Sequence, residues 1–347
     1  MSVIKKIIII SSIAALLLSV WLWVTYKEAL TVNLNIQSDK IDYSIKQGSS
    51  LSAVIYDLAS NKIIKHPRYL LWYARFNGLS NKMKAGDYRL TKNLTTKEFL
   101  NNIFTGKVIQ YSLTIIEGWS FQQLLEALND HPQIKHTLSN IPKQQIMTKL
   151  GLTGHYEGLF LPDTYHFPKD LTDIEFLKRA YKSMQSVLKE EWNNRAVGLP
   201  YKNEYEALIM ASIIEKETGL ASERQQISGV FLRRLEKRMR LQTDPTVIYG
   251  MGDKYKGNLR KKDLLQDTPY NTYRRRGLPP TPIALAGRNA IYAALHPAEG
   301  NALYFVARGD GSHQFSATLQ EHNRAVIKYQ LKGRAKSFSS YKHKKTN

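Results

Sequence analysis

The 347-residue chain contains no cysteine. A disulfide framework, a zinc finger and a thiol nucleophile are therefore excluded. The sequence also lacks a G-x-S-x-G nucleophile elbow, a P-loop and an HExxH pair, and His313 and His322 lie nine residues apart, which is not a metal-ligand spacing. Serine hydrolase and nucleotide chemistry find no support, and we expect neither a cofactor nor a metal.

Acidic residues are scarce, since 29 Asp and Glu stand against 50 Lys and Arg, giving a formal net charge of +21. Such a balance indicates acidic partners. The basic residues are scattered without a helix-turn-helix, RNP or finger signature, so we do not expect nucleic acid to be a partner. Anionic lipid and the acidic cell-wall polymer fit an exported chain, although solvated surface accounts for such charge too. The densest basic stretch, Lys328 to Asn347, lacks a periodic apolar face and is expected to be disordered.

One long apolar run lies at the N-terminus. Lys5 and Lys6 precede the run from Ile7 to Val24, whose length of about 18 residues is just enough to span a membrane. No small-residue cleavage site follows it, which favours an uncleaved anchor over a removed signal peptide. The basic flank predicts a cytoplasmic N-terminus, with everything after about Tyr26 exported.

A carboxylate, Glu215, interrupts the apolar stretch from Ala207 to Gly219. Asn203 followed by Glu206 predicts an N-cap with its capping box, and Thr218 with the following glycine predicts a stop. We therefore expect one helix of about four turns.

Spacings of three and four place Glu215 over Leu208, Ala211 and Ser212, a face of apolar and small residues. Burial on this face would raise the pKa of Glu215 and let it carry a proton near neutral pH, as a general acid must. The alternative is a structural ion pair with one of the many basic side chains. Glu217 points about 200° away around the helix, so we expect it to be structural.

The region from Val32 to Leu113 alternates strand-like runs (VNLNI, YSIKQG, AGDYRL, SLTII) with two helical runs, Leu51 to Ser60 and Pro67 to Asn77. From Tyr43 to Leu90 the order of strand, two helices and returning strand resembles a LysM module, a family that binds glycans with N-acetylated sugars. A packing or spacer role is the alternative. From Thr95 onward we expect a connecting segment.

After the connecting segment, two helices are predicted to begin after N-caps at Ser120 and Thr172. Three long loops rich in Tyr, Asn, Thr and Arg follow the pattern of a binding-cleft rim: Glu157 to Tyr165, Leu241 to Tyr249, and Tyr270 to Pro282.

Several motifs occur in a fixed order: EGLFLPDTY, ASIIEKETG, ER followed by VFLRRLEKRMRLQTDPTVIYG, YNTYRRRGLPP and HQFSATLQEHN. Together they resemble the endolytic murein transglycosylases of the MltG (YceG-like) family over nearly the whole chain. The catalytic acid of that family falls on Glu215. After GLPP the family commonly has Gly where this chain has Thr281, which affects the expected shape of that loop and leaves the acid untouched.

The resemblance implies an α+β fold with a single N-terminal transmembrane helix, a LysM-like small domain and a mixed α+β catalytic domain. The corresponding segments are a cytoplasmic N-terminus (1–6), an anchor (7–24), the LysM-like module with its connecting segment (31–112), the YceG-like catalytic domain (113–331) and a basic tail (332–347). The implied location is the bacterial inner membrane, with the catalytic domain outside the cytoplasm.

The implied reaction cuts the β-1,4 bond between N-acetylmuramic acid and N-acetylglucosamine without water and leaves a 1,6-anhydro end. One protonated Glu serves first as acid and then as base. The expected substrate-binding residues are polar or aromatic side chains of the three loops: Glu157, Asp163, Tyr165, Gln242, Asp244, Tyr270, Asn271 and Tyr273. Expected partners are peptidoglycan strands, membrane lipid and peptidoglycan synthases.

Two alternatives remain open. A hydrolase acting on the same substrate needs a second carboxylate, for which Glu157, Asp163, Glu217 or Asp244 would serve. A non-catalytic wall-binding scaffold would bind glycan through the LysM-like region and use Glu215 only as a structural group.

Overall fold

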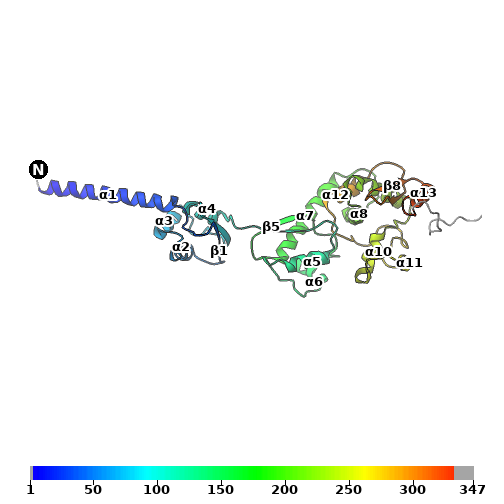
Figure 1. Cartoon of the computed structure of the whole chain (residues 1–347), viewed down its shortest axis with the longest axis horizontal. Helices are drawn as coiled ribbons and strands as arrows, with labels where there is room; N and C mark the ends of the chain where they lie inside the picture. Colours follow the sequence, from blue (N-terminus) through cyan, green and yellow to red (C-terminus); the bar gives the residue numbers. More distant parts are fainter. Residues whose placement is uncertain (1–2, 332–347) are drawn as a thin grey trace, which may run out of the picture. The chain divides into compact units, whose positions relative to one another are not determined.

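The computed structural model describes residues 3–331 and consists of two compact units (Figure 1). The first unit ends at Tyr111 and includes the short segment His166–Asp170, while the second contains Ser112–Tyr165 and the chain from Leu171 onward. Within the basic stretch expected to be disordered, Lys328 and Tyr329 belong to the last helix, so the prediction is wrong for these two residues. The remainder of that prediction, residues 332–347, lies outside the described part of the chain.

Helix α1 (Val3–Thr31) begins the first unit. It is the one helix of residues 3–331 that is long and apolar enough to cross a membrane, and its apolar window is not covered by protein. The span expected at 7–24 lies within it. At its other end, Ala29 and Leu30 are buried in the core of the first unit.

The rest of the first unit is built on a strand-helix-helix-strand motif, in the order predicted. Strands β1 (Lys40–Ile45) and β2 (Gly86–Thr91) pair antiparallel, and between them run α2 (Leu51–Ser60) and α3 (Pro67–Phe76). Ser50 caps α2 by accepting a hydrogen bond from the Ala53 N–H at 3.1 Å. The kinship of this motif to LysM modules stays a prediction.

Two sequence predictions for the first unit were wrong. The VNLNI run is not a strand, because only Asn33 makes an isolated bridge, to Thr95. The segment after Thr95 is not a connection but a helix, α4 (Thr96–Thr105), which opens with a capping box between Thr95 and Glu98. Its apolar residues recur at helical spacing and complete the core: Phe99, Leu100, Ile103 and Phe104.

The second unit opens with helices whose N-caps were predicted at Ser120 and Thr172 and are confirmed; each cap forms a capping box, with Gln123 and Glu175 respectively. These are α5 (Phe121–Asp130) and α7 (Asp173–Asn193), with α6 (Lys143–Leu150) between them. Four short strands lie along the same part of the chain: β3 (Tyr111–Thr114), β4 (Ile134–Lys135), β5 (Thr164–Phe167) and β6 (Leu171–Thr172), of which the first residue of β3 and the last two of β5 belong to the first unit.

The helix predicted around Glu215 is α8 (Glu204–Glu217). Asn203 caps it by accepting from the Glu206 N–H at 3.0 Å, as predicted, but the reciprocal half of the box is absent, because Glu206 accepts from the Lys202 N–H instead. The eight residues from Ala207 to Ile214 are all buried. The helix is therefore covered all round, by α7, α9, α10 and α12.

The elements around and after α8 complete the unit: α9 (Arg224–Glu236), α10 (Asp244–Met251), α11 (Lys261–Leu265), α12 (Arg288–Leu295) and α13 (Leu319–Tyr329), with the 3-10 turns Ala221–Glu223 and Gly252–Lys254. Strands β7 (Tyr304–Ala307) and β8 (His313–Ser316) form an antiparallel hairpin.

Candidate active site

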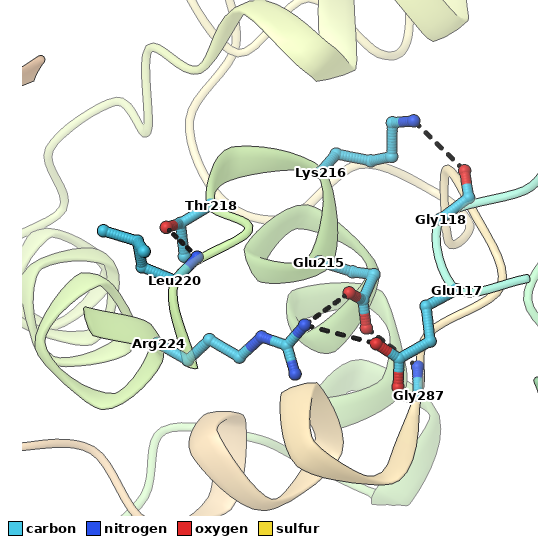
Figure 2. A network of polar contacts seen from close by, with 8 residues as sticks. All are labelled: Glu117, Gly118, Glu215, Lys216, Thr218, Leu220, Arg224 and Gly287. Atoms are coloured by element: carbon cyan, nitrogen blue, oxygen red, sulfur yellow. Dashed lines mark hydrogen bonds and ion pairs between the residues drawn. The ribbon is translucent and has the colours of Figure 1, made fainter. Parts of the chain in front are cut away.

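Glu215 lies in the last turn of α8, with only 4% of its side chain exposed. Two groups hold its carboxylate, as Figure 2 shows. Arg224 Nη2, at the start of α9, donates to Oε1 at 2.9 Å, and the Gly287 N–H, just before α12, donates to Oε2 at 2.9 Å. The end of α8, the start of α9 nine residues later and the loop before α12 therefore meet at one carboxyl group.

Burial raises the pKa of Glu215 above its ordinary value, against the lowering effect of the Gly287 N–H and the Arg224 guanidinium; the charge of Glu117 raises it further. An ion pair that dominated the site would instead lower the pKa. The group is thus able to hold a proton, while its two donors stabilise the carboxylate left after that proton departs. Such balance is what a single acid and base requires.

A second carboxylate, Glu117, shares the same guanidinium. Its Oε2 lies 3.3 Å from Arg224 Nη2, and its side chain is 44% exposed. Since both carboxylates contact one nitrogen, their nearest oxygens are at most about 6 Å apart, a limit that allows the separation of about 5 to 5.5 Å found for the carboxyl pair in retaining glycosidases. Glu117 is therefore the carboxylate that the structure places beside Glu215.

The backbone is arranged so that Glu117 approaches Gly287 closely. A Cβ atom at position 287 would lie 1.9 Å from Glu117 Oε1, and the φ of −75° there is ordinary, so glycine is needed for space and not for conformation. Nearby, Lys216 Nζ donates to the Gly118 carbonyl at 3.1 Å, and the Gly118 N–H donates to the Leu285 carbonyl at 2.8 Å. These bonds hold the two loops together over the end of α8.

Glu157 is buried elsewhere in the second unit, at 2% exposure. Its Oε1 accepts from the Phe121 N–H at 2.8 Å, at the start of α5, and its Oε2 from the Tyr249 hydroxyl at 3.2 Å. Burial raises its pKa to about 7 despite these donors. Glu157 thus ties the predicted rim loop to α5 and α10.

Three of the predicted binding residues gather in one open cavity of about 570 Å³. Gln242 and Asp244 are exposed on its wall, and Tyr273 donates its hydroxyl to Asp244 at 2.6 Å. Glu217 lines it too and accepts from the Thr243 hydroxyl at 2.7 Å, while burial raises its pKa. The cavity lies on the side of α8 to which Glu217, not Glu215, points.

The other predicted binding residues shape their own loops. The Asn271 amide donates to the Leu264 and Gln266 carbonyls, and the Tyr165 hydroxyl donates to the Leu161 carbonyl. The Tyr270 hydroxyl hydrogen-bonds Thr281 Oγ1 at 2.9 Å, and Asp163 is exposed. Whether any of the eight residues contacts substrate stays a prediction.

The model of the YceG-like family matches residues 43–328, which cover most of both units. The chain belongs to the YceG-like family. An endolytic murein transglycosylase of Bacillus subtilis is 34% identical over 321 residues, which cover 86% of this chain and 85% of that protein. Two of Streptococcus pneumoniae are 25% identical over 94% of this chain, which spans 65% of their length.

A solved structure supports membership of the YceG-like family as well. The crystal structure of a YceG-like protein from Listeria monocytogenes shares 31% identity, with a TM-score of 0.54, and the match covers 82% of this chain and 98% of that one.

Sequence reasoning missed three groups of this YceG-like site: Glu117, Arg224 and the Gly287 N–H. Only Arg224 carried a signal, because it is the second residue of the ER motif. Glu117 lies three residues before the predicted N-cap Ser120, where the sequence signals only the start of a helix, and a backbone N–H has no signature in a sequence. Only tertiary packing brings Glu117 and Gly287 to Glu215.

Proposed function

We propose that this chain is a membrane-anchored endolytic murein transglycosylase, a lyase that cleaves peptidoglycan strands with Glu215 as its acid and base. The observation that carries the proposal is the buried Glu215 carboxyl, whose pKa is raised while Arg224 and the Gly287 N–H stand ready to hold its carboxylate. The relatives named for this activity match most of this chain.

The steps follow from one carboxyl group. Protonated Glu215 donates its proton to the glycosidic oxygen between N-acetylmuramic acid and N-acetylglucosamine, and the bond from that oxygen to carbon 1 breaks. The Glu215 carboxylate then takes the proton of the muramic carbon-6 hydroxyl, whose oxygen bonds to carbon 1. A 1,6-anhydro end and a free N-acetylglucosamine end result, and the enzyme regains its proton.

Helix α1 supplies the anchor of this proposal. With Lys5 and Lys6 at its cytoplasmic end, it places the folded units outside the cytoplasm, at the bacterial inner membrane. An enzyme held there reaches nascent strands beside the peptidoglycan synthases and would terminate their elongation. The length of the glycan strands in cells that carry only an anchorless form of the protein tests this role. If the strands keep their normal length, the anchor does not direct termination.

Glu117 gives a two-carboxylate hydrolase one specific observation in its favour, its contact with the same guanidinium as Glu215. The four carboxylates that the sequence suggested for this role make no ion pair or hydrogen bond with Arg224 among the described residues: Glu157, Asp163, Glu217 and Asp244. In a hydrolase, Glu117 would attack carbon 1, and the product would end in a reducing sugar.

The deciding experiment digests purified peptidoglycan with the full chain in detergent and analyses the products by mass spectrometry. Wild type is compared with Glu215→Gln, Glu117→Gln and the control Glu299→Gln, whose side chain is exposed. We expect products one water lighter than hydrolysis products and resistant to borohydride from wild type, Glu117→Gln and the control, and none from Glu215→Gln.

Other outcomes point elsewhere. Reducible products that disappear with Glu117→Gln would establish the hydrolase. Cleavage that survives in Glu215→Gln would move the catalytic role away from this residue. If wild type and all variants bind glycan strands without cleaving them, the non-catalytic wall-binding scaffold would be the remaining interpretation.

A further inference from the structure

Helix α3 of the first unit carries an unusual outer face. Trp72, Arg75 and Phe76 lie four, seven and eight residues after Arg68, so the four residues share one side of the helix. Phe76 is 83% exposed and Trp72 is 53% exposed. The opposite side of α3, by contrast, is packed in the core through residues such as Leu70. We call these four residues the outer face of α3.

The chemistry of this outer face is that of a membrane interface. Neither the Arg68 nor the Arg75 guanidinium has a hydrogen-bond or ion-pair partner among the described residues, and both side chains line an open hollow of about 630 Å³ together with Trp72. Exposed aromatic rings flanked by free cations are typical of protein surfaces that lie at lipid headgroups, where the rings meet the acyl boundary and the cations meet phosphates.

The outer face of α3 is continuous with the apolar helix α1. A chain of ring contacts runs from α1 to α3: Trp23 to Tyr26 with centroids 6.1 Å apart, Tyr26 to Tyr69 at 6.4 Å, and Tyr69 to Trp72 at 5.9 Å. Within the first unit, α3 lies close to the end of α1, as Figure 1 shows.

The geometry of α1 gives the depth of this contact. With a rise of about 1.5 Å per residue, Tyr26 lies about 3 Å along the axis beyond Val24, where the apolar run ends. The headgroup layer on each side of a bilayer is about 5 to 8 Å thick. Tyr26, and with it Tyr69 of α3, therefore lies at the level of the headgroups when the apolar run fills the hydrocarbon core.

We propose that the outer face of α3 docks on the anionic surface of the bilayer that α1 spans, with Trp72 and Phe76 at the acyl boundary and Arg68 and Arg75 paired with lipid phosphates. The inference rests on the anchor role of α1 within the proposed function, and it adds a second attachment that fixes the orientation of the first unit on the membrane.

The absence of cysteine from the chain allows a direct test. Single cysteines are introduced at Leu16, Phe76 and Val197 of the full chain, and a nitroxide label is attached to each. The proteins are reconstituted in vesicles of phosphatidylcholine containing about one-third phosphatidylglycerol. Collision of the label with oxygen and with a water-soluble nickel chelate gives its depth. Val197, in the second unit, is the matched control because it is fully exposed.

We expect the labels at 16 and 76 to be reached by oxygen and shielded from the chelate, and the label at 197 to be reached by the chelate. In the Arg68→Ala/Arg75→Ala background the docked fraction at position 76 should fall, because two basic residues contribute about 30-fold to binding at an anionic surface. The control pair Lys182→Ala/Lys189→Ala, exposed at the same spacing on α7, should leave it unchanged.

The two proposals fail separately. A label at 16 in water would overturn the anchor, and the docking with it. A label at 16 in lipid with a label at 76 in water would overturn the docking alone. If position 76 changes its surroundings only when soluble glycan strands are added, the outer face binds glycan and the lipid assignment is wrong.

Discussion

The substitution Gly287→Ala separates the two possible roles of Glu117. An added Cβ would lie 1.9 Å from Glu117 Oε1, and a Cβ essentially never approaches another atom within 3.0 Å. The carboxylate must therefore retreat by at least about 1 Å, which breaks its 3.3 Å contact with Arg224. The hydrogen bond from the backbone N–H of residue 287 to Glu215 is retained, and the ordinary φ at this position leaves the backbone unstrained.

The expected cost to stability is small. Glu117 is 44% exposed, so the lost ion pair contributes less than about 1 kcal/mol to the free energy of unfolding, and Tm should fall by no more than about 4 °C. Activity should fall less than about tenfold, since only an indirect contact is lost. Because the charge of Glu117 raises the pKa of Glu215, its retreat lowers that pKa, and the alkaline limb of the pH profile of kcat should move to lower pH.

The assay is the rate of anhydro-ended product against pH, with Tm measured on the same samples. Gly219→Ala is the matched control, because no atom lies within 4 Å of the added Cβ and φ is not positive. In a Glu117→Ala background, Gly287→Ala should add little, since its clash is gone. A loss of about 100-fold at unchanged Tm, with no movement of the alkaline limb, would refute the reasoning and make Glu117 catalytic.

Three further outcomes are expected. Arg224→Gln removes a charge that lowers the pKa of Glu215, so the alkaline limb of kcat should move to higher pH; an unmoved limb would contradict the pairing. Burial raises the pKa of Glu157 to about 7, so its contribution to the free energy of unfolding is fully present below its unfolded pKa of 4.5 and is lost as pH rises to about 7, by up to about 3 kcal/mol. The free energy measured by denaturant unfolding should therefore fall less steeply with pH over this range in Glu157→Gln than in wild type; equal slopes would contradict the raised pKa. Gly158→Ala should cost more than about 2 kcal/mol, because its φ is +82° and the added Cβ would lie 2.4 Å from Pro282; an unchanged unfolding midpoint would argue against that close approach.

Local signals in the sequence predicted much of the helical framework. The N-caps at Asn203, Ser120 and Thr172 and the bounds of α2 agree with the structure, because each depends on residues within one turn of the helix end. Helix α4 was missed, although Thr95 and Glu98 form the same kind of box, because its polar residues masked its short apolar pattern.

The site was predictable only at its centre. Spacing placed Glu215 on a buried face, but its partners come from nine and 72 residues further along the chain, and spacing carries no information about such contacts. Glu217 was expected to be structural because it points about 200° away from Glu215 around the helix, and that role stays a prediction. Since α8 is covered all round, Glu217 is buried too, and the same desolvation acts on both carboxyl groups.

Helix α1 passes into the first unit without an interruption. Between Val3 and Thr31 it contains neither glycine nor proline, the residues at which helices most often bend, and its last turns are held by the core through Ala29 and Leu30. Such a junction has no hinge, so the helix and the rest of the first unit rotate together as one rigid body. If α1 spans a bilayer, as proposed, a change in bilayer thickness that alters the tilt of the helix would also tilt the first unit, unless the docked outer face of α3 holds that unit on the surface. Bilayer thickness would then influence the orientation of the first unit relative to the membrane.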